Sequence, residues 1–233
     1  MKLIGLFLRG NNVTCPIISL SYSKFLPYGR VNPRPNALCP DSLSLERHRL
    51  LWLYLQQKTN FFDQPLHFLH IAPEQCFMKA FEKQHKDGYI TADIESPLAK
   101  VKMDVHNIPF EADTFDVAMC NHVMEHVEDD IKAMSEIYRV LKPGGWAIMQ
   151  VPFFRPVGSV TYEDKSIIDP KERESVYGQD DHVRLYGHDY PDRIRQAGFE
   201  VLEDRFIDEL SKAQIKKYAL PPNETIFFCK KTS

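Results

Sequence analysis

The sequence lacks long apolar runs, an excess of basic residues and an even set of cysteines. None of its apolar segments approaches the ~20 residues of a membrane-spanning helix, and the apolar part of the opening MKLIGLFLRG is too short for a secretory signal. The formal net charge of −3 provides no general basic surface for nucleic acid. The five cysteines are scattered, which is typical of a reduced chain. These absences favour a soluble, cytoplasmic protein with neither a membrane nor a nucleic-acid partner.

What the sequence does contain is an ordinary globular composition, with 43% apolar and 26% charged residues among 233. This length fits one α/β domain with additions better than two full domains. We expect an irregular segment over residues 1–42 that opens with a short strand, followed by the main domain over residues 43–233. The first segment is predicted to be irregular because prolines interrupt it at positions 16, 27, 33, 35 and 40.

Strand-like and helix-like patterns alternate along the main domain. An amphipathic helix over 44–58 comes first. The later apolar runs predict strands at 66–72, 89–94, 100–105, 114–123, 146–152, 200–207 and 224–231, with helices at 73–85, 129–141 and 189–199. Such alternation implies βαβ units, and hence a doubly wound α/β fold with a mostly parallel sheet. Residues 153–188 break the rhythm and form a charged, tyrosine-containing insertion.

Acidic residues stand at the ends of two predicted strands, where an open parallel sheet binds its ligands. Asp93 lies about 20 residues beyond the first strand, the spacing at which a carboxylate accepts the two hydroxyls of a ribose. Asp104, next to the apolar Val105, is placed to accept from an exocyclic amine such as that of adenine. Together they predict a nucleoside site. The structural alternatives are a helix cap for Asp93 and a turn for Asp104.

An ordered series of motifs gives these positions a family context. ADI followed by MDVHNIPFEADTFDVAMCNHVMEHVEDDIKAMSEIYRVLKPGGWAIMQVP resembles the class I S-adenosylmethionine-dependent methyltransferases of the type 11 group. The resemblance implies a seven-stranded Rossmann-like sheet with an antiparallel C-terminal strand, and S-adenosylmethionine as the cofactor. The strand ends and the resemblance together indicate the cofactor-binding residues Ala72, Pro73, Glu74, Asp93, Ile94, Asp104, Val105, Asn121 and His122.

The first loop departs from the family pattern. It reads HIAPEQCF over 70–77, where the family normally has a glycine-rich G-x-G-x-G loop. S-adenosylmethionine has no pyrophosphate, so no phosphate-binding loop is needed. Ala72 still permits a close approach of the backbone to the cofactor, and Glu74 can pair with its ammonium group. The absence of these glycines argues against a nicotinamide dinucleotide, whose pyrophosphate requires them.

Residues 15–49 have the outline of two zinc knuckles, each a Cys-Pro-x-Cys pair. Related-looking sequences would carry cysteine at Ile18 and Ser42, and this chain retains only Cys15 and Cys39. A structural zinc ion requires four nitrogen or sulfur ligands, and His48 offers only a third. We therefore expect a degenerate, metal-free segment here and no metal site in the protein.

The insertion over residues 153–188 is expected to cover the methyl acceptor. Its most function-like piece is DHVR, residues 181–184, followed by Tyr186. We expect His182 or His122 to take the proton of the acceptor, because imidazole is suited to this role at neutral pH. Arg184 and Tyr186 are the expected substrate-binding residues, and the alternative is a solvated helix and turn. His126 is interpreted as a helix cap or a packed residue.

The functional interpretation is a methyltransferase that acts on an unidentified small-molecule acceptor. A non-catalytic sensor or scaffold that binds S-adenosylmethionine is the alternative, motivated by the glycine-free loop and the degenerate knuckles. Nucleic-acid methylation is a weaker hypothesis, because the loop after the fourth strand reads CNHVMEH rather than Asn-Pro-Pro-aromatic, and the chain is acidic overall.

Overall fold

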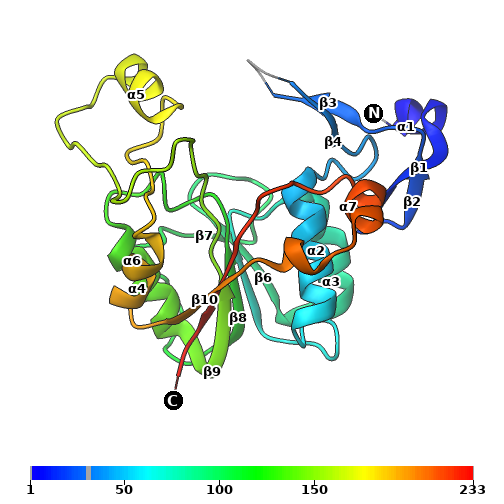
Figure 1. The fold of residues 1–233 in the computed structure, drawn as a ribbon. Helices are drawn as coiled ribbons and strands as arrows, with labels where there is room; N and C mark the ends of the chain where they lie inside the picture. The colour runs from blue at the N-terminus through cyan, green and yellow to red at the C-terminus, as the bar shows by residue number, and fades with distance from the viewer. Residues whose placement is uncertain (1, 30–32, 233) are drawn as a thin grey trace. The chain divides into compact units, whose positions relative to one another are not determined.

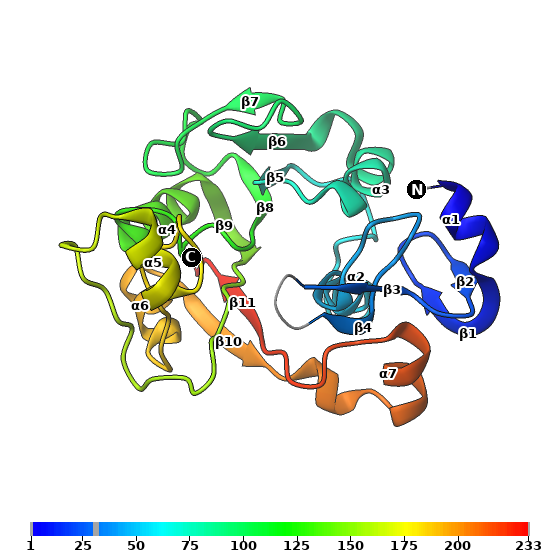
Figure 2. The same cartoon turned by 90° about the horizontal axis from the view of Figure 1, so that it is seen from above.

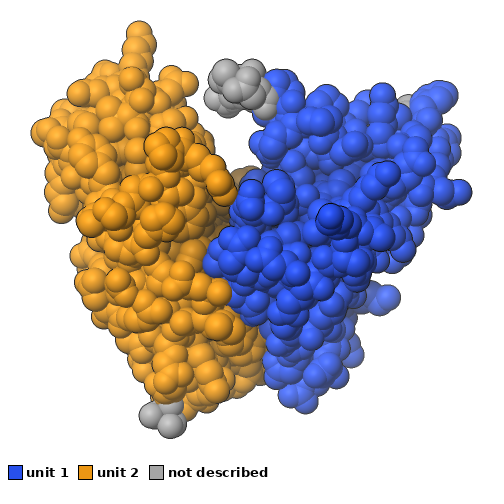
Figure 3. Space-filling view, in the orientation of Figure 1, with its two compact units in different colours: residues 1–65, 74–86, 204–226 blue, residues 66–73, 87–203, 227–233 orange. Residues whose placement is uncertain are grey.

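The computed structural model describes residues 2–29 and 33–232, which divide into two compact units (Figure 3). The sheet unit comprises residues 66–73, 87–203 and 227–233. The amino-terminal unit comprises residues 1–65, 74–86 and 204–226. Each unit is therefore built from separate stretches of the chain, and the predicted boundary at residue 42 stays a prediction.

The central feature of the fold is a seven-stranded sheet with the order β10-β11-β9-β8-β5-β6-β7 (Figures 1 and 2). Strands β5 to β9 are joined by parallel pairings, and β11 runs antiparallel to β9. Its strands are β5 (Phe68–Ile71), β6 (Tyr89–Asp93), β7 (Val101–Lys102), β8 (Phe115–Cys120), β9 (Leu141–Ile148), β10 (Glu200–Asp204) and β11 (Ile226–Lys230). The predicted mostly parallel sheet with an antiparallel C-terminal strand is confirmed.

The register of the central strands places their carboxyl ends at one edge. Ile71 of β5 pairs with Ala92 of β6 on one side and with Cys120 of β8 on the other. All four residues of β5 are buried, as expected for a central strand covered on both faces. The residues that follow this row, among them Ala72 and Asp93, consequently emerge at the same edge of the sheet.

Three helices belong to the sheet unit: α4 (Asp130–Val140), α5 (Pro170–Tyr177) and α6 (Tyr190–Gln196). Helix α4 begins where the Asp129 carboxylate caps the backbone N–H of Lys132, and it directs an apolar face at the sheet. The buried core that joins α4 and α6 to the strands includes Leu69, Ala118, Met134, Ile137, Val140, Ala147, Met149, Ile194 and Phe199.

The run Lys142–Gly145 ends helix α4, as its Pro-Gly-Gly composition predicts, but it also forms the first part of β9. Gly144 has a φ of +79°, in the left-handed region that favours glycine. Its N–H donates to the carbonyl of Lys231, whose own N–H donates to Gly145. The turn residues are thus secured by the end of β11.

The amino-terminal unit contains regular structure where an irregular segment was expected. It holds α1 (Lys2–Phe7), β1 (Arg9–Cys15), β2 (Leu20–Tyr22), β3 (Leu26–Tyr28), β4 (Arg34–Leu38), α2 (Glu46–Lys58), α3 (Gln75–His85), η2 (Phe206–Glu209) and α7 (Lys212–Tyr218). Strands β1 and β2 pair antiparallel, as do β3 and β4.

Two expectations for residues 1–42 were therefore wrong. The opening residues form a helix rather than a strand. A short continuous apolar run has no periodicity by which a sequence could distinguish the two elements. Prolines do not exclude strands here, since Pro27 and Pro35 lie in two-stranded ribbons, where a missing N–H can face outward. The predicted helix at 44–58 exists and begins at Glu46.

Arg49, on α2, is a buried structural residue of the amino-terminal unit. Its guanidinium donates to backbone carbonyls of Asn36, Ala37, Ser44, Tyr218 and Ala219. Burial lowers the pKa of Arg49 to about 10. This side chain links β4 to the end of α7. None of the helices in the described part of the chain combines the length and apolar content required to span a bilayer.

Candidate functional site

A cavity of about 350 Å³ lies in the sheet unit at the ends of β5, β6 and β8. Its volume is in the range of small-molecule sites. Six predicted cofactor-binding residues line it: Ala72, Asp93, Ile94, Asp104, Val105 and His122. The lining also includes residues that sequence reasoning did not assign to the cofactor: Ile71, Met103, His106, Val123, His126, Val127 and Glu128.

Asp93 ends β6, and the hydrogen bonds of its carboxylate all involve one of the two oxygens. Its Oδ1 accepts from the backbone N–H groups of Glu95 and Ser96, both at 2.8 Å. No hydrogen bond to Oδ2 is found among the described residues. The helix-cap alternative is wrong, because no helix directly follows Asp93 in the described part of the chain, and its Oδ1 holds a turn instead. A ligand role for Asp93 stays a prediction.

Asp104 and His106 form a hydrogen-bonded pair that lines the same cavity. Oδ1 of Asp104 accepts from the backbone N–H of His106 at 2.9 Å and lies 2.8 Å from its Nδ1. The Nε2 atom of His106 lies 3.2 Å from the backbone N–H of Asp129, so Nε2 accepts and Nδ1 carries the proton. The backbone hydrogen bond from His106 is the main cause that lowers the pKa of Asp104. The carboxylate is therefore ionised at neutral pH.

His122 follows β8 in a strained backbone conformation. Its φ of +56° lies in the left-handed region that bulky residues rarely adopt. Its backbone N–H donates to the carbonyl of Gln150 at 2.7 Å. On the side chain, Nδ1 lies 3.4 Å from Oε1 of Glu125, while Nε2 has no partner among the described residues. The imidazole is oriented by a carboxylate, its residue lines the cavity, and its other nitrogen is enclosed without a partner among the described residues.

Three predicted cofactor residues are not among those that line the cavity. Asn121 is buried, and its Oδ1 accepts from the backbone N–H of Gln150. Pro73 is absent from the lining. Glu74 belongs to the amino-terminal unit, where it precedes the first residue of α3. The role of each toward the cofactor stays a prediction.

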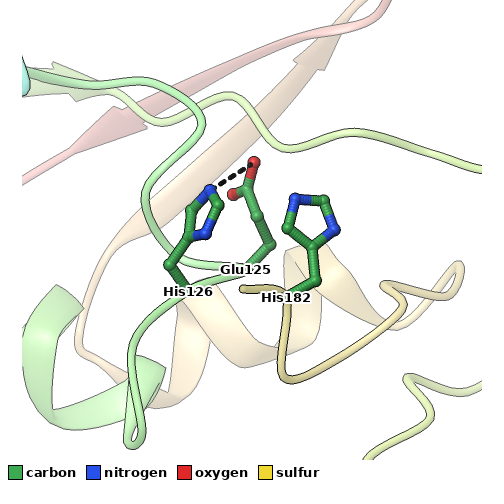
Figure 4. A group of neighbouring side chains, drawn as sticks. All are labelled: Glu125, His126 and His182. Carbon is green, nitrogen blue, oxygen red and sulfur yellow. Dashed lines mark ion pairs between the residues drawn. The ribbon is translucent and has the colours of Figure 1, made fainter. Parts of the chain in front are cut away.

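His182 is completely buried and does not line this cavity. Its Nδ1 lies 3.3 Å from the carbonyl of Tyr177, and its Nε2 has no partner among the described residues. Burial, together with the nearby His126, lowers the pKa of His182. Figure 4 shows its ring facing the carboxylate of Glu125, with His126 on the other side of that carboxylate. A role as a base toward a cavity-bound acceptor is not supported by this position.

Arg184 and Tyr186 both have structural partners within the sheet unit. Arg184 is 1% exposed, and its five N–H groups are all engaged. They donate to the carbonyls of Met124, Val127 and Glu128 and to the carboxylate of Glu163. The hydroxyl of Tyr186 lies within hydrogen-bond distance of Met124 and Asp130. Both side chains tie residues 124–130 to the insertion, and their role toward a substrate stays a prediction.

Asp130 is the buried acid of this network. Arg193 on α6 donates to its two oxygens at 2.8 and 2.5 Å. Burial alone would raise the pKa of Asp130, but the pairing with Arg193 and the nearby Arg184 outweigh it, so the pKa lies below its usual value. The ion pair joins the first turn of α4 to α6.

This depressed pKa predicts an acid-labile stability. A carboxyl group whose pKa is lower in the folded state stabilises the fold above its unfolded pKa of about 3.9, and this contribution is lost as the pH falls further. Asp130→Asn is expected to cost about 2 kcal/mol at pH 7 and to flatten the fall in unfolding free energy below pH 4. Urea unfolding at pH 7, 4 and 3 measures both quantities. An unchanged acid dependence in the variant would contradict the assignment.

A second cavity of about 320 Å³ is formed largely by the insertion. It is lined by His126, Glu128, Glu163, Asp164, Lys165, Ile167, Ile168, Arg173, Val183 and Arg184. His126 and Glu128 line both cavities, so the two are adjacent. His126 had been interpreted as a cap or a packed residue. Its position between two cavities could not be read from sequence spacing, because it depends on how the insertion folds back.

Comparisons with known proteins agree with this geometry. Residues 64–149 match a family described as methyltransferase domain. A ubiquinone/menaquinone biosynthesis C-methyltransferase from Vibrio vulnificus is 30% identical over 112 residues, which are 43% of each chain. A 2-phytyl-1,4-naphtoquinone methyltransferase from Nostoc punctiforme is 39% identical over 59 residues, about a quarter of each chain. The matches thus span less than half the length of these relatives.

Solved structures share the fold at low sequence identity. A methyltransferase-like protein from Bacillus halodurans aligns with a TM-score of 0.50 and 16% identity, covering 80% of this chain and 98% of its own. The [4+2]-cyclase SpnF aligns with a TM-score of 0.53 and 14% identity, covering 84% and 86%. Residues 64–149 therefore match a methyltransferase domain, and the chain shares the fold of these solved structures.

The zinc-knuckle resemblance finds no support, since the family match covers residues 64–149 and does not include residues 15–49. In the structure, Sγ of Cys15 lies 3.3 Å from the hydroxyl of Ser42. The hydrogen bond from Cys39 lowers the pKa of Cys15 to about 6, and the same bond raises that of Cys39. Hydrogen bonds therefore join these side chains where a knuckle would have metal bonds.

Proposed function

We propose that this protein is an S-adenosylmethionine-dependent methyltransferase whose cofactor occupies the 350 Å³ cavity. The observation that carries the proposal is the convergence of Asp93, Asp104 and His122 on one cavity at the ends of parallel strands. Oδ2 of Asp93 accepts from the ribose, and Asp104 accepts from the adenine amine. His122 lies toward the methyl group and takes the proton of the acceptor.

The first loop supports this cofactor although it contains no glycine. Ala72 has a φ of +48°, the left-handed conformation for which the family normally uses glycine, and its N–H donates to the carbonyl of Ala92. Alanine carries the smallest side chain that can occupy this position. The backbone can therefore approach a cofactor that has no pyrophosphate.

Calorimetry tests the cofactor assignment. We expect S-adenosylhomocysteine to bind with one site per chain and NAD not to bind. Asp93→Asn keeps the Oδ1 acceptor of the turn and replaces Oδ2 with an N–H donor, so it should raise the Kd about 100-fold. Glu95→Gln, an exposed neighbour outside the cavity, is the control and should leave the Kd unchanged. Absence of binding to the wild type would overturn the proposal.

The acceptor is proposed to be a small molecule that enters the second cavity, beneath residues 163–173. Two features support this placement. The second cavity shares His126 and Glu128 with the first, so a bound acceptor would lie next to the methyl group. Its volume of about 320 Å³ suits a small molecule rather than a polymer.

A non-catalytic cofactor-binding protein is the second candidate. It is favoured by the burial of His182 and Arg184. Of the two residues predicted to act as the base, only His122 lines the cofactor cavity. The structural similarity to a [4+2]-cyclase is a second supporting feature, because one fold can serve different reactions. Formation of S-adenosylhomocysteine in a screen of small hydroxyl and amine compounds distinguishes the two: the enzyme produces it, and the binding protein does not.

A further inference from the structure

We propose that Glu125, His126 and His182 form a binding site for a divalent transition-metal ion, best matched by Zn²⁺. One ligand atom from each residue lies within 4.8 Å of the others. Figure 4 shows the carboxylate of Glu125 between the two imidazole rings. Two imidazole nitrogens and one carboxylate oxygen are a common donor set for zinc with an open fourth position.

The hydrogen bonds of both histidines are those of metal ligands. Nδ1 of His126 lies 3.2 Å from the carboxylate of Asp181, and Nδ1 of His182 lies 3.3 Å from the carbonyl of Tyr177. Each Nδ1 can therefore donate a proton to an oxygen acceptor, which leaves a lone pair on Nε2. Metal-binding histidines characteristically use one nitrogen in this way and coordinate with the other.

The atoms that would face the ion have no other partner. Oε2 of Glu125 and Nε2 of His182 are buried without a hydrogen bond among the described residues. Glu125 is 2% exposed and His182 is 0% exposed. Nε2 of His126 is 3.9 Å from Oε1 of Glu125, too far for a hydrogen bond. Leaving these two buried acceptors unpaired is costly, and one cation would satisfy both.

The backbone holds the two ligand-bearing segments together without the ion. The N–H of Val183 donates to the carbonyl of Glu125 at 2.9 Å, next to His182. Arg184 donates to the carbonyls of Met124 and Val127, which flank the other two ligands. The ligand geometry is therefore organised in advance, as an effective metal site requires.

The location suggests what the ion would do. His126 lines both cavities, so a metal beside it would lie at the wall between the cofactor and the acceptor. Its open coordination position would take an oxygen of the acceptor, a hydroxyl or a carboxylate. A hydroxyl held there loses its proton more readily. This role in acceptor binding rests on the proposed function, whereas the metal site itself does not.

Titration of the EDTA-treated, dialysed protein with Zn²⁺ against a fluorescent zinc indicator tests the site. We expect one ion per chain. His126→Ala and His182→Ala should each weaken binding at least about 100-fold, because even the outer partners of metal-binding histidines contribute about 10- to 100-fold. Asp181→Asn, an exposed residue, should weaken it about tenfold. His188→Ala, an exposed histidine in the same segment, is the matched control and should bind like the wild type.

Three outcomes would overturn the site: no stoichiometric binding, equal binding by wild type and His126→Ala, or loss of binding in Cys15→Ser with retention in His126→Ala. The last would assign the ion to the cysteine pair. If His182→Ala fails to fold, as judged by circular dichroism, His126→Ala and Asp181→Asn still decide. A protein that binds S-adenosylhomocysteine but not Zn²⁺ would refute only this inference, and the reverse would refute only the proposed function.

Discussion

Replacing His122 with asparagine is expected to lower the rate of methyl transfer about 100- to 10,000-fold, the range that a positioned base contributes. Asparagine tolerates the left-handed backbone of this position better than other side chains do, so the loop should keep its conformation. Its amide can also replace Nδ1 as a neighbour of Glu125. What the variant loses is Nε2, the ring nitrogen that has no partner among the described residues and that we propose as the base.

Steady-state kinetics with an acceptor obtained from the screen would measure this effect. The loss should fall on kcat, while the Kd for S-adenosylhomocysteine changes less than about fivefold. His67→Asn, at an exposed histidine outside both cavities, is the matched control and should keep full activity. If cofactor affinity falls as much as turnover does, His122 is a binding residue and not the base.

The second large effect is expected at Arg184. Arg184→Met should lower the free energy of unfolding by about 3–5 kcal/mol, because it removes a buried cation that donates to the Glu163 carboxylate and to three backbone carbonyls. For a chain of 233 residues this corresponds to a fall in Tm of roughly 6–20 °C. Methionine keeps most of the apolar volume, so the lost interaction is chiefly polar.

Thermal and urea unfolding of Arg184→Met would be compared with those of Arg195→Met. Arg195 is a half-exposed arginine on α6, paired with Asp192 and Glu203, and exposed pairs contribute only about 0–1 kcal/mol. An Arg184 variant as stable as the Arg195 variant would contradict the structural role. It would also restore the substrate-binding interpretation of the side chain.

The cavity at the strand ends was largely predictable from sequence, since the carboxyl ends of parallel strands fall at one edge of a sheet. Asp93, Asp104 and His122 follow separate strands, and the register of β5, β6 and β8 places them around one cavity. That only one oxygen of the Asp93 carboxylate accepts hydrogen bonds from the protein was not predictable. It depends on the turn that Glu95 and Ser96 make at its Oδ1.

The surroundings of the second cavity were harder to predict because its residues come largely from an insertion without regular periodicity. The DHVR motif at residues 181–184 does not report burial. His182 proved to be enclosed and Arg184 to be fully engaged with backbone carbonyls. In the amino-terminal unit, proline content likewise concealed two short antiparallel ribbons.

The strands of the seven-stranded sheet and the acids at their ends could be read from the sequence alone. The patterns that indicate them, hydrophobic periodicity and local spacing, extend over only a few residues. Only the tertiary structure decided which polar groups remain available. Glu125, His126 and His182 lie up to 57 positions apart in the numbering of the chain, and their approach depends on the Val183–Glu125 hydrogen bond and on Arg184. Such contacts are set by the packing of distant segments, which no local pattern encodes.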